Sequence, residues 1–188
     1  MTPWITQPIP FNIGQGAAAE APVVPMVCYN ADELNTIYEY VKTTSTNFVV
    51  GAYIDGTSNP VYNEDVTTIS TYIYAESDTS GGVFALGVWD SSGDLKNESD
   101  TFTVDDMPVG TVPNVPTEKI TKSITSTTIE DGDTIGIICK TAITGDGQVA
   151  NGGYDKGSAI ANWKRGVFTQ GGTVTAQANR VLVICVNE

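Results

Sequence analysis

The chain has 188 residues, 22 of them acidic and 9 basic, and its formal net charge is −13 at pH 7. A surface this negative repels phosphate backbones and anionic lipid headgroups, which argues against nucleic acid and membranes as partners. The sequence contains no histidine, which excludes Ser-His-Asp and Cys-His nucleophile systems and histidine-ligated metal sites.

The length suits one domain that buries its own core without help from a disulfide or a metal. Charged residues make up only 16% of the chain, and Thr, Ser, Gly and Val fill the difference, which is typical of β-proteins. The first residues lack a basic segment followed by a continuous apolar one, so no secretory signal is predicted, and no apolar run is long enough to span a bilayer. We expect a protein that is made in the cytosol and is either retained there or leaves by a route other than Sec, of which virion assembly followed by lysis is one.

Residues 1–27 are predicted to form an extended arm. Proline fixes φ and cannot donate a ladder hydrogen bond, so a proline-rich segment is neither a central strand nor a regular helix. Five of the nine prolines lie in the first 25 residues: Pro3, Pro8, Pro10, Pro22 and Pro25. Large apolar residues recur among them, which a solvated linker does not need: Trp4, Ile5, Ile9, Phe11 and Ile13. We expect this arm to dock on its own domain or on a neighbouring subunit; a flexible tail is the alternative.

Residues 30–41 fit either a short helix or a strand, because their apolar spacing agrees with both. Strand signals then repeat from residue 48 onward, separated by turn dipeptides such as Asp55-Gly56. The Pro-rich segment 105–119 and the Gly-rich segment 145–157 are predicted as loops. The predicted strands are Phe48–Ile54, Ile69–Tyr74, Val83–Trp89, Ser99–Val104, Ile120–Thr128, Thr134–Thr141, Val167–Gln170, Thr173–Ala178 and Arg180–Val186.

About eight strands with little helix predict an all-β, jelly-roll-type antiparallel sandwich over residues 28–188. Part of this region resembles jelly-roll modules that occur as carbohydrate-binding modules and as decoration, fibre and adhesin domains of viruses and archaeal cell surfaces. Two turns carry the resemblance within about residues 65–140: Trp89-Asp90-Ser91-Ser92-Gly93 after a strand, and Asp131-Gly132-Asp133 before a buried strand. The resemblance implies a binding or assembly domain.

Several residues are candidates for binding. Aromatic rings on an outward sheet face could stack on sugars, and Tyr72, Tyr74, Trp89 and Trp163 are the candidates; a place in the core is the alternative for each. Asp131 and Asp133 are weak candidates for Ca²⁺, which needs several oxygen ligands, and no cofactor is expected otherwise. The remaining catalytic possibility is a carboxylate pair, for which Glu76, Asp90 and Glu130 are candidates, but no enzyme is predicted.

Three cysteines, an odd number without short spacing, argue against a disulfide framework or a zinc site. Cys139 and Cys185 lie in apolar strand segments, where we expect small buried hydrophobic residues. A bridge between these two remains an alternative.

The sequence therefore predicts a virion structural protein, a capsid-decoration, fibre or spike component. Such subunits form symmetric homo-oligomers, with trimers favoured, and contact other virion proteins or surface glycans. Two alternatives stay open: a lectin-like carbohydrate-binding module, and a cell-surface filament subunit that assembles by strand addition.

Overall fold

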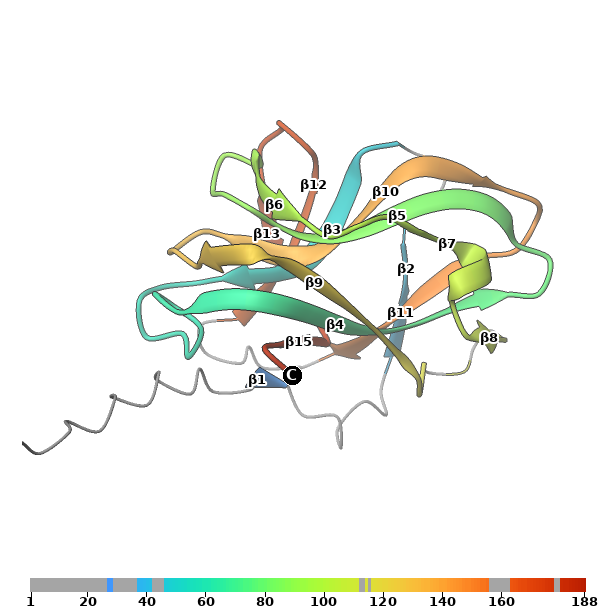
Figure 1. Ribbon diagram of the computed structural model, residues 1–188, viewed down its shortest axis with the longest axis horizontal. Coiled ribbons are helices and arrows are strands. Elements are labelled where there is room, and N and C mark those ends of the chain that lie inside the picture. Colours follow the sequence, from blue (N-terminus) through green and yellow to red (C-terminus); the bar gives the residue numbers. More distant parts are fainter. Residues whose placement is uncertain are drawn as a thin grey trace, which may run out of the picture.

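The computed structural model describes residues 27–28, 37–41, 46–111, 114, 116–155, 163–177 and 180–188. These residues form two β-sheets packed face to face, with antiparallel pairing throughout except for one two-residue strand (Figure 1). The predicted all-β sandwich is confirmed. Among the described residues, no helix is long and apolar enough to cross a membrane.

The first sheet is built around a 12-residue strand, β4. Its members are β1 (Val27–Cys28), β2 (Ile37–Tyr40), β4 (Asp65–Glu76), β8 (Val109–Gly110), β9 (Lys119–Thr128), β11 (Val149–Asp155), β14 (Arg180–Leu182) and β15 (Ile184–Val186). The second sheet has β3 and β10 at its centre. It comprises β3 (Phe48–Ile54), β5 (Ser80–Trp89), β6 (Leu95–Glu98), β7 (Phe102–Thr103), β10 (Thr134–Thr144), β12 (Trp163–Thr169) and β13 (Thr175–Gln177).

Most of the predicted strands are present, with three corrections. The Pro-rich segment predicted as a loop at 105–119 contains the two-residue strand β8. The Gly-rich segment predicted as a loop at 145–157 contains β11, whose backbone pairs with β2, β4 and β14. The strand predicted at Ser99–Val104 is reduced to β7, because a 3-10 turn at Val104–Asp106 ends it. The ambiguous segment 30–41 ends in strand β2, while residues 29–36 lie outside the described part.

Alternating side chains place the main core between the sheets. In β5, Phe84, Leu86 and Val88 point inward and are fully buried, as the period of two predicts. Burial of one such side chain stabilises the fold by about 1.5–3 kcal/mol. The core therefore provides the main driving force for closing the sandwich.

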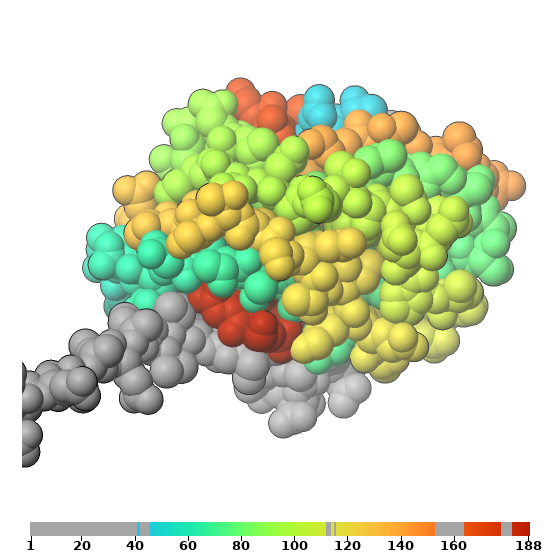
Figure 2. All heavy atoms as spheres, in the orientation of Figure 1, coloured from blue at the N-terminus to red at the C-terminus, as the bar shows by residue number. Residues whose placement is uncertain are grey.

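The C-terminal strand is wedged between β4 and β11. β14 pairs with β11, β15 pairs with β4, and the chain breaks between them at Val183. Two buried hydrogen bonds connect β11, β4 and the C-terminal segment at this point. Asn151 Nδ2 donates to Thr71 Oγ1 (2.7 Å), and Thr71 Oγ1 donates to the Val183 carbonyl (3.1 Å). In Figure 2 the red C-terminal residues lie on the surface next to β4 (teal) and the start of β9 (yellow).

A row of four glycines runs across the second sheet. Gly166 of β12 pairs with Gly51 of β3, Gly51 with Gly136 of β10, and Gly136 with Gly87 of β5. A Cβ on Gly136 would overlap the carbonyl oxygen of Val50 and lie 2.6 Å from the Gly51 Cα. The strand backbones therefore approach more closely here than a side chain would allow.

The outer face of the second sheet carries a smaller core of its own. It consists of the buried residues Val49, Ala85, Trp89, Ile138 and Phe168, with Val174 packed against them. The β5–β6 and β12–β13 turns cover this face, since the Gly171 N–H donates to the Gly93 carbonyl (2.8 Å). Hydrophobic packing therefore continues on the side of the sheet that faces away from the main core.

The cysteines differ from expectation. Cys139 is a buried thiol outside any disulfide, as predicted, but Cys185 is disulfide-bonded and is not simply a buried hydrophobic residue. The alternative bridge between Cys139 and Cys185 is therefore wrong. In the β1–β15 ladder, the backbone of Cys28 stands opposite that of Cys185.

The stability of the fold should fall at alkaline pH because of Cys139. Burial raises the pKa of this thiol from 9.0 to about 11, so the unfolded chain loses its proton first as the pH rises. The neutral thiol contributes about 2–3 kcal/mol to the free energy of unfolding. This contribution is complete below pH 9 and is lost progressively as the pH rises toward 11. Urea unfolding at pH 8 and pH 10.5 should show a smaller pH effect for Cys139→Ala than for the native chain; equal effects would contradict the assignment.

Candidate functional site

A groove of about 530 Å³ opens beside the C-terminal half of β4. Two backbone hydrogen bonds tie the segment that forms it onto β4: Ala75 N–H donates to the Pro108 carbonyl (2.9 Å), and Ile73 N–H donates to the Glu118 carbonyl (3.1 Å). Between these points runs β8, parallel to β4 (Figure 1). The groove is therefore fixed to the sheet at both ends of the loop, although most of its wall is loop.

Tyr74 lies beneath the groove and is almost entirely buried. Its hydroxyl donates to the Asn114 carbonyl (3.0 Å), and only 4% of the residue is exposed. The ring lies so close to Gly110 that a Cβ there would overlap it. Loop positions without side-chain bulk thus let the 105–119 segment close over the tyrosine.

The lip of the groove is apolar and exposed. Val109 is 77% exposed, and prolines 108 and 116 also line the groove. Glu118 is the one charged residue among the described lining, and Thr111 and Thr117 add hydroxyl groups. The groove thus offers an exposed apolar lip and a few polar groups above a buried tyrosine, and concave sites that combine apolar walls with few polar groups are typical of ligand binding.

The four predicted aromatic residues do not form one platform. Tyr72 is half-buried on β4, with its Cα partner Lys119 on β9. Trp89 lies in the other sheet and is completely buried, where its Nε1–H donates to Gln170 Oε1 (3.4 Å) and its ring meets Phe168 edge-on. Trp89 is therefore a core residue and cannot stack on a ligand. Trp163 begins β12, and its side chain lies outside the described part of the chain.

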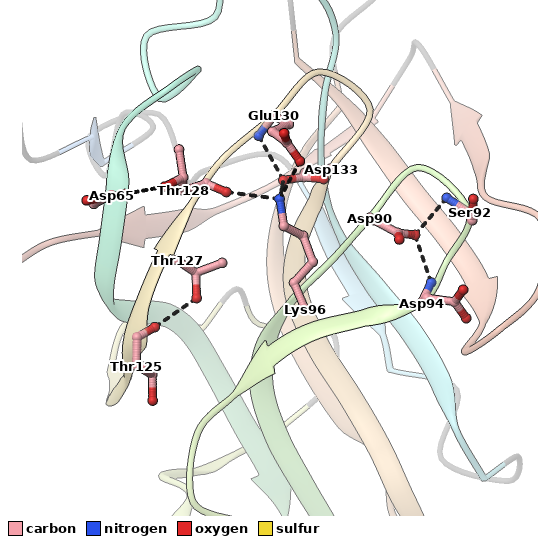
Figure 3. A network of polar contacts seen from close by, with 10 residues as sticks. All are labelled: Asp65, Asp90, Ser92, Asp94, Lys96, Thr125, Thr127, Thr128, Glu130 and Asp133. Carbon is pink, nitrogen blue, oxygen red and sulfur yellow. Dashed lines mark hydrogen bonds and ion pairs between the residues drawn. The ribbon is translucent and has the colours of Figure 1, made fainter.

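A second cluster of polar groups surrounds Lys96 of β6 (Figure 3). Its Nζ lies 2.9 Å from Asp133 Oδ2 and 2.9 Å from Glu130 Oε2, and it also donates to the Thr128 carbonyl (3.0 Å). The Asp133 side chain is 2% exposed and that of Glu130 72%. One ammonium group thus holds together the second sheet and the turn that joins β9 to β10.

Burial and pairing act in opposite directions on this cluster. Desolvation raises the pKa of Asp133, and its hydrogen bonds from Lys96 and the Glu130 N–H offset this only in part. Desolvation lowers the pKa of Lys96, but the bonds to Asp133 and Glu130 outweigh it, so the net shift is upward. Lys96 was missed in the sequence, although a base beside an acidic turn in a chain with few bases is a usable signal.

The two residues that were candidates for Ca²⁺ binding have different hydrogen-bond partners. Asp131 Oδ1 accepts the Gly56 N–H (2.7 Å), whereas the ammonium of Lys96 occupies the position that a cation would take beside Asp133. Among the residues that the structure describes, no group of three or more acidic or cysteine side chains is arranged to hold a metal.

The carboxylates considered for catalysis each have a separate partner. Asp90 Oδ1 accepts the N–H groups of Ser92 and Asp94 and so closes its own turn (Figure 3). Glu76 Oε2 accepts the Gln148 N–H (3.1 Å), and Glu130 contacts Lys96. The arm residues Trp4, Ile5, Ile9, Phe11 and Ile13 lie outside the described residues.

Comparison with known proteins gives no relative. No protein-family model matches the chain, and no curated protein and no solved structure matches it either. The resemblance to viral and archaeal jelly-roll modules stays a prediction.

Proposed function

We propose that the chain is a structural protein of a virion, a capsid-decoration, fibre or spike component, which assembles into homo-oligomers through its N-terminal arm. The observation that carries the proposal is the groove beside Tyr74. The exposed lip of the groove is apolar at Val109, and the arm sequence combines Pro3, Pro8 and Pro10 with large apolar residues that can pack against it. The groove of one copy is the proposed receptor for the arm of another.

Charge favours the arm as the occupant. Copies with a net charge of −13 repel each other. The first 19 residues contain no charged side chain, so the arm can approach an acidic neighbour without that cost. Among the described residues that line the groove, Glu118 is the only one that adds a negative charge.

The length of the arm allows exchange between copies. Twenty-six residues precede β1, and a fully extended segment of that length spans roughly 80 Å. Arms that cross between subunits of a closed ring bury apolar surface that a monomer would leave exposed, and a trimer is the favoured assembly.

The disulfide supports a role outside the reducing cytosol. Cys185 is disulfide-bonded, and disulfides persist mainly in oxidising surroundings. A particle released from its host meets that condition.

The assembly is tested by light scattering on the full chain, on a chain that lacks residues 1–26, and on point variants. We expect the full chain to be an oligomer and the truncated chain a monomer. Val109→Lys, at the exposed lip, should weaken association at least tenfold, because it places a charge where the apolar arm binds. Leu95→Lys is the matched control, since Leu95 is the other exposed large hydrophobic residue among those described and lies on β6.

A truncated chain that keeps the mass of the full oligomer would rule out the arm as the assembly element. Equal weakening by Val109→Lys and Leu95→Lys would rule out the groove as its receptor.

A second candidate function is carbohydrate binding in the same groove. The favouring observation is the exposed hydroxyls of Thr111 and Thr117 and the carboxylate of Glu118 along the groove, since the hydroxyl groups of sugars form hydrogen bonds with such groups. In a glycan array, Thr117→Val and Glu118→Gln should lose the signal of the native chain while the oligomeric mass stays unchanged. An array without hits for the native chain counts against this candidate.

A further inference from the structure

We propose that Lys96 and Asp133 form an intramolecular isopeptide bond, an amide between Nζ of Lys96 and Cγ of Asp133, with Glu130 as the proton-transferring group. This bond would join β6 covalently to the turn between β9 and β10. The inference is independent of the proposed function and rests on the cluster in Figure 3.

The groups that would react are already in hydrogen-bond contact. The Lys96 amine lies 2.9 Å from Asp133 Oδ2, and the Glu130 carboxylate contacts the same nitrogen at 2.9 Å. Backbone contacts hold the acid in place, because the Glu130 N–H donates to Asp133 Oδ2 (2.8 Å) and the Asp133 N–H donates to the Glu130 carbonyl (3.2 Å). A nucleophile held this close reacts at a high effective concentration.

Burial favours the uncharged reactants. The Asp133 side chain is 2% exposed, and a desolvated carboxyl resists ionisation. Proton transfer from the Lys96 ammonium to the Asp133 carboxylate gives a neutral amine and a neutral acid, the pair that can condense. Hydrogen bonds to both carboxylates favour the charged amine, so the neutral pair is the minor form and bond formation is expected to be slow.

The reaction balances without an external reagent. The amine lone pair of Lys96 attacks Cγ of Asp133, and a C–N bond forms. Glu130 accepts a proton from the attacking nitrogen and passes it to the carboxyl hydroxyl, which leaves as water when its C–O bond breaks. One ammonium and one carboxylate are consumed, one amide and one water are produced, and the net charge of the chain does not change.

The product would close a ring across a large part of the fold. The two residues are 37 positions apart, and β7, β8 and β9 lie between them. A covalent link of this kind restricts the unfolded chain, as a disulfide does, and adds stability that reducing agents do not remove.

Intact-mass spectrometry of the denatured, fully reduced full-length chain tests the proposal. We expect the native chain to be one water lighter than its sequence, and Lys96→Arg, which keeps the positive charge, to have the full mass. Proteolysis should yield a branched peptide that joins the Lys96 and Asp133 segments, with no tryptic cleavage after Lys96. Glu130→Gln should slow bond formation at least tenfold after refolding.

Asp133→Asn is the decisive variant. Its condensation with Lys96 releases ammonia in place of water, so the cross-linked variant and the cross-linked native chain have the same final mass. Circular dichroism confirms that each variant is folded.

Two results would overturn the proposal. One is a native chain that keeps its full mass after prolonged incubation of the folded protein. The other is a water loss that persists in Lys96→Arg, which would come from succinimide formation at Asp131-Gly132 instead of from the lysine.

Discussion

Gly136→Ala is expected to lower the free energy of unfolding by at least about 4 kcal/mol. Because the whole free energy of unfolding of a domain is about 5–15 kcal/mol, this loss should leave the domain largely unfolded. The added Cβ would overlap the Val50 carbonyl oxygen and lie 2.6 Å from the Gly51 Cα. Both atoms belong to the backbone of β3, which is paired on its other side with β12. No flexible side chain can move to relieve the overlap, so two strands would have to separate.

Urea unfolding followed by circular dichroism measures this effect, with Gly171→Ala as the matched control. Gly171 has a φ of +74°, and the nearest atom to an added Cβ is Asp94 Oδ1 at 3.8 Å. That substitution should lower the free energy of unfolding by only about 1 kcal/mol, because alanine is less favourable than glycine at a positive φ. If the two variants have similar midpoints, the glycine row does not require close backbone contact.

Trp89→Ala is expected to lower the free energy of unfolding by about 3–5 kcal/mol. The side chain is fully buried in the outer core and meets Phe168 with ring centroids 6.2 Å apart. Its removal leaves a cavity between the β5–β6 and β12–β13 turns and deprives Gln170 of a hydrogen-bond donor. Trp89→Phe should recover more than half of the loss, because it keeps an aromatic partner for Phe168.

Chemical unfolding of these two variants and the native chain checks the assignment of Trp89 to the core. A binding residue would behave differently: Trp89→Ala would then unfold at the native urea concentration and lose only affinity for a ligand. Native stability of Trp89→Ala would therefore contradict the core position.

The strands were predictable where alternation is regular and turn residues bracket it. β3, β4 and β5 contain the predicted segments 48–54, 69–74 and 83–89. β11 was not predictable, because Gly152 and Gly153 give no apolar alternation, and their strand conformation comes from neighbours on both sides. Glycine leaves the backbone free, so the surrounding ladders decide its conformation.

The candidate site was predictable only in part. An outward aromatic on β4 led to Tyr74, which lines the groove. The other residues of that groove come from a loop whose path depends on backbone bonds to β4. The same pattern that selected Tyr74 also selected Trp89, which the second core buries. Alternation tells which face a side chain takes, but it does not tell what covers that face.

The sequence by itself determined the all-β class, the acidic surface, the absence of histidine chemistry and the inward face of strands such as β5, because these depend on composition and on a period of two residues. The tertiary structure decided which strands pair, which of two similar aromatics is buried, which cysteine is bridged and which acids meet Lys96. The physical reason is sequence distance: Gly51 and Gly136, or Lys96 and Asp133, become neighbours only after two sheets have formed, and no local pattern encodes that approach.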